Sequence, residues 1–206
     1  HRAMGYRHGE ANDWQALGLL YEDIGDWVSA YRCYQRALKI NEATDYREGI
    51  ANDLGNLGGL YILLGKYSAA HETHERALQS HRALKHRYGI AKDTENLALV
   101  AFLRKDFQTA LEYARQALRA YRHLGSPHEQ ATALLNLAVI YQHLLKLRLA
   151  LRLQHRALRL VRRLGNPDAL FRAFVGRGDT YAKLGQMREA EGNWRGAIAL
   201  LESARG

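Results

Sequence analysis

Apolar residues recur along this chain with the spacing of an amphipathic α-helix, and polar residues occupy the positions between them. The first apolar face has the spacing i, i+3, i+4 and i+7 and comprises Trp14, Leu17, Gly18 and Tyr21. A second face with helical spacing follows a break at Gly25-Asp26 and comprises Ala30, Tyr34, Ala37 and Leu38. Glycine suits the positive φ that is common at the end of a helix. The pattern therefore predicts two helices joined by a short turn, which is a helix hairpin.

The hairpin pattern recurs at a constant interval along the chain. Five copies align without gaps when residues 11, 51, 91, 131 and 171 are taken as first positions. The eighth position is Gly or Ala in every copy, and the twentieth and twenty-seventh positions are always Ala. Small residues at these positions let the two helices approach closely, and bulky ones would overpack the hairpin. A fixed period of forty residues predicts a solenoid, in which each repeat buries its apolar face against its neighbours.

We therefore expect one continuous array with repeats at residues 11–50, 51–90, 91–130, 131–170 and 171–206. Residues 1–4 match residues 81–84, so residues 1–10 are expected to be the tail of a preceding repeat. The last helix keeps an apolar stripe, formed by Ala197, Ile198, Leu200 and Leu201, with no capping helix after it. Because solenoids normally end in a repeat with a polar outer face, we expect a segment of a longer protein. Self-association through the uncapped last helix is an open alternative.

Composition restricts the possible classes of function and location of this chain but does not identify one function. The single cysteine, Cys33, excludes an intrachain disulfide framework and fits a reducing compartment, so a cytoplasmic location is expected. There is no apolar run long enough to cross a bilayer, and membrane association is not expected. The formal net charge of +9 favours an acidic partner.

The chain shows no constellation of residues suited to catalysis. There is no nucleophile with a plausible base and orienting acid. His71 and His74 are at i and i+3 rather than the i and i+4 of a metalloprotease helix, and a third ligand is not evident. We therefore expect neither an enzyme nor a metal or other cofactor.

The repeat resembles the tetratricopeptide repeat. The resemblance rests on Leu at position seven, Gly or Ala at eight, Tyr at eleven, and Ala at twenty and twenty-seven, and copies one and two match best. It covers almost the whole chain, although the family standard of about 34 residues is shorter than the repeat found here. Arrays with the longer repeat are similar to those of kinesin light chains, Pins-type adaptors and the sensor arms of bacterial signal-transduction ATPases. The resemblance implies an all-α, right-handed superhelical solenoid of five antiparallel hairpins that binds peptides or proteins.

The resemblance also implies that positions two, five, six, nine, twelve and thirteen of each first helix line a concave groove. Position six carries Asn56, Asn96 and Asn136, whose amides could clamp the backbone of an extended peptide. Alternatively, these asparagines bridge adjacent first helices. Neighbouring groove positions in the middle copies are expected to offer apolar pockets to a ligand. Alternatively, some of their apolar side chains pack between helices. These positions are Leu99, Phe102, Leu103, Leu135, Val139 and the one polar residue, His143. Toward the first copy the groove turns polar and acidic, with Asn12, Gln15, Glu22 and Asp23.

The second helix of copy four is strongly basic. Residues 130–167 hold seven Lys and Arg and no acidic residue. Five arginines are expected along one helical face and form a candidate surface for an acidic partner: Arg148, Arg152, Arg156, Arg159 and Arg163. The alternative is a solvated convex face. Nucleic acid is disfavoured as the partner because the stripe lacks aromatic side chains on which bases could stack.

Two further departures from the repeat are local. Arg177 occupies position seven of copy five, where leucine is expected, which predicts altered packing there. Lys105 and Leu145 stand where other copies have a turn glycine.

The leading hypothesis is thus a scaffold that holds a protein or peptide segment in its concave groove. The first alternative is a ligand-sensing or oligomerisation arm of a larger signalling ATPase or transcription regulator. The second is binding of nucleic acid or an acidic partner through the basic helix of repeat four.

Overall fold

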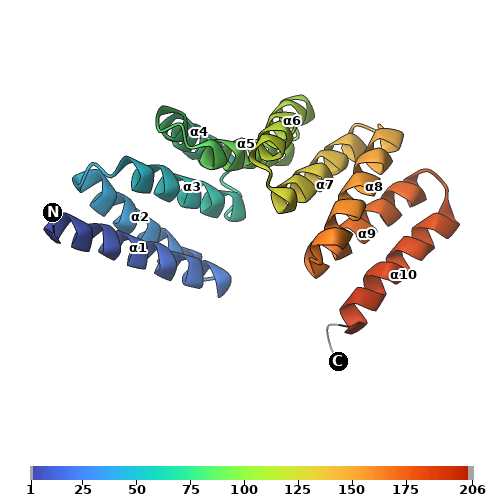
Figure 1. Cartoon of the computed structure of the whole chain (residues 1–206), viewed down its shortest axis with the longest axis horizontal. Helices are drawn as coiled ribbons and strands as arrows, with labels where there is room; N and C mark the ends of the chain where they lie inside the picture. Colours follow the sequence, from blue (N-terminus) through green and yellow to red (C-terminus); the bar gives the residue numbers. More distant parts are fainter. Residues whose placement is uncertain (1, 204–206) are drawn as a thin grey trace. The chain divides into compact units, whose positions relative to one another are not determined.

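The computed structural model describes residues 2–203, which form ten α-helices joined by short turns (Figure 1). Residue 1 and residues 204–206, which belong to the expected end segments, lie outside the described part. The helices are α1 (Arg2–Asp23), α2 (Trp27–Ala43), α3 (Arg47–Leu63), α4 (Tyr67–Ala83), α5 (Arg87–Leu103), α6 (Phe107–Leu124), α7 (Pro127–His143), α8 (Leu147–Leu164), α9 (Pro167–Lys183) and α10 (Met187–Ser203). Within residues 2–203, no helix is long and apolar enough to cross a membrane.

The helices belong to two compact units, of which the first ends at Lys105 and the second begins at Asp106. In the first unit α1 pairs with α2 and α3 with α4, while α5 packs on α4 and α3. In the second unit α7 pairs with α8 and α9 with α10, while α6 packs on α7. The predicted all-α solenoid of helix hairpins is confirmed. Helix α1 is longer than the other first helices, because it runs without a break through residues that were expected to end a preceding repeat.

Helix ends recur at equal intervals along the chain, which explains the constant length of the repeat. Each of nine turns has one residue with positive φ: Gly25, Asp45, Gly65, Lys85, Lys105, Gly125, Leu145, Gly165 and Gly185. In the turn at Gly65, the N–H of Lys66 donates to the Tyr61 carbonyl at 2.8 Å, and the N–H of Gly65 donates to the Ile62 carbonyl at 3.0 Å. This is the Schellman arrangement, which satisfies the last carbonyls of a helix. One repeat is therefore two helix–turn halves of equal length.

The two helices of a hairpin approach most closely where a glycine at position eight lies under a ring at position 24. Three hairpins have this pairing, namely Gly18 with Tyr34, Gly58 with His74, and Gly178 with Trp194. A Cβ atom on Gly58 would lie 2.6 Å from Nε2 of His74, whose side chain is fully buried. Where position eight is Ala98 or Ala138, position 24 is not aromatic. The predicted role of small residues in close packing is thus confirmed, and the ring opposite decides between glycine and alanine.

Two buried aspartates at position three join neighbouring hairpins of the first unit. The Asp53 carboxylate accepts hydrogen bonds from Nδ2 of Asn41 at 2.7 Å and from Nε2 of Gln15 at 2.5 Å. Burial raises the pKa of Asp53 to about 6, and the hydrogen bonds from these neutral donors offset it only in part.

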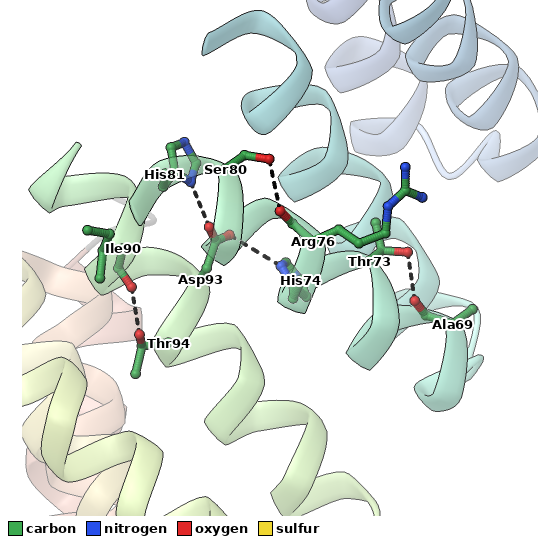
Figure 2. Close-up of polar contacts among 9 residues, drawn as sticks. All are labelled: Ala69, Thr73, His74, Arg76, Ser80, His81, Ile90, Asp93 and Thr94. Atoms are coloured by element: carbon green, nitrogen blue, oxygen red, sulfur yellow. Dashed lines mark hydrogen bonds and ion pairs between the residues drawn. The ribbon is translucent and has the colours of Figure 1, made fainter. Parts of the chain in front are cut away.

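Asp93 occupies the same position one repeat later but has imidazole partners. Figure 2 shows His81 and His74 on α4 pointing at this carboxylate, with Nδ1 to oxygen distances of 2.7 Å and 3.5 Å. Burial alone would raise the pKa of Asp93, but the two histidines outweigh it, His81 by a hydrogen bond and both by positive charge, and they lower the pKa below its ordinary value. The same repeat position thus carries a weakened acid in one copy and a strengthened acid in the next.

Substitution of adjacent glycines in α3 tests the close helix approach. We expect Gly58→Ala to lower the free energy of unfolding by about 1–3 kcal/mol, because its Cβ would overlap the buried His74 ring. Gly59→Ala should instead raise it by up to about 1 kcal/mol, because that Cβ meets no atom within 4 Å and alanine favours helix. Urea unfolding of both variants measures the difference; equal effects would contradict this packing.

The turn at Leu145 carries a removable strain. Leu145 has φ of +56° and is 80% exposed, so Leu145→Gly should relieve a left-handed backbone without loss of packing. We expect a gain of about 1 kcal/mol in the free energy of unfolding. The control is Leu184→Gly, at a helix end with φ of −89°, which should destabilise the protein. A loss of stability in Leu145→Gly would show that the turn is not strained.

The two aspartates should differ in their pH dependence between pH 5 and 7.5, because the lowered pKa of Asp93 makes its contribution to stability fall only at more acidic pH. A raised pKa means that the folded state binds the proton more tightly, so the contribution of Asp53 to stability rises as the pH falls from above 6 toward 4. Asp53→Asn should therefore be tolerated best at pH 7.5 and should remove this part of the pH dependence. Asp93→Asn should lower the free energy of unfolding at pH 7.5 by about 2 kcal/mol or more, because it weakens a buried ion pair. Denaturant unfolding at pH 5 and 7.5 distinguishes the two; a larger loss at pH 7.5 in the Asp53 variant would contradict the assignment.

Candidate functional site

A cavity of about 480 Å³ lies in the first unit over the first helices of three repeats, α1, α3 and α5. Its lining comprises Gln15, Leu19, Glu22, Tyr34, Asn52, Gly55, Asn56, Gly59, His81, His86, Tyr88, Gly89, Lys92, Asp93 and Asn96. Most of these residues stand at repeat positions two, five, six, nine and twelve, which were expected to face the groove. The structure therefore brings the expected groove positions of three successive repeats to one cavity.

Two glycines on α3 account for part of this hollow. Gly55 and Gly59 are one helical turn apart, at the repeat positions where copy one has Gln15 and Leu19. A Cβ on Gly59 would meet no atom within 4 Å, and one on Gly55 would lie 3.7 Å from Oδ1 of Asp93. The α3 backbone is therefore accessible to a ligand at this point. The sequence interpretation missed these residues, although two glycines at i and i+4 inside a helix are an unfavourable and thus informative choice.

The cavity carries charge of both signs. On the α1 side, Oε2 of Glu22 accepts a hydrogen bond from the Tyr34 hydroxyl at 2.8 Å. Burial and this hydrogen bond raise the pKa of Tyr34, so its hydroxyl stays a donor. Lys92 contributes an exposed ammonium group on the α5 side. A ligand could therefore meet a carboxylate at one side of the cavity and an ammonium group at the other.

The three asparagines at position six have different surroundings. Asn56 and Asn96 are half-buried in the cavity lining, and neither makes a hydrogen bond to another residue in the described part of the chain. Asn136 lies on α7 in the second unit, and its Oδ1 accepts a hydrogen bond from Nη2 of Arg172 on α9 at 3.1 Å. Asn136 thus makes the helix-bridging contact that was the alternative interpretation of this position.

The predicted apolar positions also differ from one another. Leu99 on α5 is 42% exposed, whereas Phe102, Leu103 and Val139 are half-buried. Leu135 is only 5% exposed and belongs to the core of the second unit, where it offers no surface to a ligand. His143 is exposed, and its ring stacks on Phe107 with centroids 5.3 Å apart.

The predicted basic stripe is present on α8 in the second unit. All five of its arginines, Arg148, Arg152, Arg156, Arg159 and Arg163, are exposed. Within the described residues, none of them forms an ion pair with an acidic side chain. Arg156 and Arg159 line two cavities, one of about 530 Å³ that extends to α9 and one of about 320 Å³ that extends to α6 and α7.

Solved structures with similar folds come from several kinds of protein. BtubC (BKLC) from P. vanneervenii is 21% identical, with a TM-score of 0.81 over all of this chain and 92% of that one. A putative kinesin light chain with TPR-like repeats from Podosopora anserina is 15% identical, with a TM-score of 0.76 over 95% of this chain and 96% of that one. A signal-transduction ATPase with a tetratricopeptide repeat sensor from Pyrococcus horikoshii is 16% identical, with a TM-score of 0.72 over 93% of this chain but 32% of that one. At these identities the likeness establishes the fold alone.

The sequence itself matches no curated protein at a significant level. Family models described as tetratricopeptide repeat match residues 10–83 and 129–205, and a second such model matches residues 94–127. These matches confirm the resemblance seen in the repeat pattern, and they agree with the hairpins of both units. The chain therefore belongs to the tetratricopeptide repeat family.

Proposed function

We propose that this chain is a protein-interaction scaffold whose first unit binds an extended segment of a partner protein across α1, α3 and α5. The observation that carries the proposal is the cavity in which Asn56 and Asn96 stand beside the bare backbone of Gly55 and Gly59. An amide side chain offers donors and an acceptor together, so it can pair with both groups of a peptide backbone. The two asparagines lack protein partners among the described residues, so a ligand need not break an existing bond.

The lining of the cavity also supports a particular ligand chemistry. One side chain of the segment would enter the hollow beside Gly59, where nothing lies within 4 Å of a Cβ position. Leu19 and Leu99 are 52% and 42% exposed on the flanking helices and would contact apolar side chains. A basic residue of the segment would face Glu22, and an acidic residue would face Lys92. The preferred ligand is therefore an extended peptide with an apolar centre and a basic end toward α1.

The related structures support a second possible role for the same surface, as the sensor of a larger protein. A tetratricopeptide repeat array forms the sensor of the Pyrococcus horikoshii ATPase. If this array belongs to such a protein, the same groove would act as its sensing surface. Flanking sequence that encodes a phosphate-binding loop would favour that setting.

A peptide-display selection on the protein, followed by affinity measurement of the enriched peptides, tests the groove. We expect the double variant Asn56→Ala and Asn96→Ala to weaken binding by about tenfold or more, since each lost hydrogen bond contributes about 0.5–1.5 kcal/mol. Gly59→Leu should abolish binding by filling the cavity while leaving the helix intact. The matched controls are Asn136→Ala and Gly192→Leu, because Gly192 is an open helical position in the second unit.

The controls make the result interpretable. Equal affinities of all variants for every enriched peptide would place the binding surface elsewhere and would contradict the proposal. Equal weakening by Gly192→Leu and Gly59→Leu would mean that the loss arises from the substitution itself and not from the cavity.

A further inference from the structure

The positive charge of this protein is concentrated in one part of the chain. Residues 106–206 contain 16 Lys and Arg but only eight Asp and Glu, whereas residues 1–105 contain 14 and 13. Nearly all of the net charge of +9 therefore belongs to the second unit. Helix α8, at residues 147–164, contributes six arginines and no acidic residue.

Some of these arginines line a cavity in the second unit, which shares no residue with the groove proposed in the first unit. The cavity between α8 and α9 has a volume of about 530 Å³. Its lining is almost entirely basic and comprises Arg152, His155, Arg156, Leu158, Arg159, Arg162 and Arg177. All but Arg177 come from α8, and no carboxylate lines the cavity.

Arg177 is the residue that distinguishes this cavity from the rest of the array. It stands at position seven, where Leu57, Leu97 and Leu137 are buried in other repeats. Its Nε donates a hydrogen bond to Oδ1 of Asn193 at 2.5 Å. Because the asparagine is neutral, it orients the guanidinium group without compensating its charge.

An aromatic ring fixes the same group from another side. The guanidinium carbons of Arg177 and Arg162 lie 5.8 Å and 5.7 Å from the centroid of the Phe174 ring, within cation–π distance. Two positive groups therefore share one ring at the edge of the cavity.

Two acidic residues on α9 and α10 have other partners. Asp179 on α9 accepts a hydrogen bond from Nε1 of Trp194 at 3.1 Å, and Glu191 on α10 lies 3.7 Å from Arg195.

The positive groups of the cavity also repel one another. Burial lowers the pKa of His155, and the charges of Arg177 and Arg159 lower it further. Burial and the charge of Arg162 lower the pKa of Arg177, with Tyr181 opposing in part. An anion in the cavity would relieve this repulsion.

We propose that the cavity between α8 and α9 is a second binding site, which takes an acidic segment of a partner protein and pairs its carboxylates with Arg156, Arg159 and Arg177. The planar guanidinium fork matches a carboxylate in a bidentate manner, and three such groups on two helices can hold successive acidic side chains. Nucleic acid fits less well, because a stacked base needs an open ring. Phe174 is already contacted by two arginines, and Tyr181 lies against His155 with centroids 6.4 Å apart. The site does not depend on the proposed groove in the first unit.

Fluorescence anisotropy with three labelled probes at 50 and 200 mM NaCl tests this proposal. The probes are a twelve-residue peptide rich in Asp and Glu, its Asn and Gln counterpart, and a single-stranded oligonucleotide with the same number of negative charges. We expect the acidic peptide to bind more tightly than the oligonucleotide and the neutral peptide not to bind. Equal or tighter binding of the oligonucleotide at both salt concentrations would overturn the choice of partner.

Variants of the protein locate the site. Arg177→Leu restores the residue that other repeats carry, so it should keep or raise the thermal midpoint of unfolding. The same variant should weaken binding of the acidic peptide by about tenfold or more. Arg159→Gln, at an exposed position, should also weaken binding and serves if Arg177→Leu alters the packing. The control Arg188→Gln removes one exposed charge outside the cavity and should change affinity by less than about twofold. If both cavity variants behave like Arg188→Gln, the attraction is a general effect of net charge and the site does not exist.

Discussion

The close approach of paired helices within each unit is the constraint on which the rest of this structure depends. At position eight the backbone of a first helix lies against the side chain at position 24 of the second, so Gly58 leaves no room for a Cβ beside His74. Alanines at positions twenty and twenty-seven are buried in every repeat. Because these contacts use one face of each first helix, they leave the other face for the positions that line the cavity. The surface proposed to bind a partner is thus a consequence of how the hairpin packs.

Contacts between hairpins allow more variation than contacts within them. At position three the first unit uses Asp53 and Asp93, with amide and imidazole partners respectively, whereas the second unit has the small apolar residues Ala133 and Ala173. A buried polar contact specifies its partners closely, because an unmatched carboxylate would be costly to bury. An apolar contact depends mainly on volume. At position three the two units therefore use different chemistry, and the second unit places its buried polar contact elsewhere, where Gln142 and Gln154 donate hydrogen bonds to Thr180.

The fold could be predicted from the sequence because its determinants are local and repeated. The small residues at positions eight, twenty and twenty-seven reappear in every repeat, so one misleading position, such as Arg177, does not obscure the pattern. The candidate site was less accessible because it depends on differences between repeats. Asn56 and Asn96 were expected to face the cavity and do so, but Asn136 bonds to Arg172, and Leu135 points into the core. Such outcomes depend on the side chains of adjacent helices, which the repeat alone does not specify. The glycines of the cavity were overlooked because a missing side chain has no chemistry of its own.

Both candidate sites coincide with residues that stability alone would not select. Gly55 and Gly59 cost about 1 kcal/mol each relative to alanine in a helix, although the space above Gly59 is open. Arg177 places a charge where a leucine would be buried, and its only hydrogen-bond partner in the described structure is a neutral amide. Departures of this kind from local rules are expected where a protein binds something, because the binding partner supplies what the free structure lacks. In the first unit the departure removes side chains and exposes backbone at the proposed groove. In the other it adds a positive group to a cavity that already repels its own charges, so that an acidic ligand would stabilise the protein on binding.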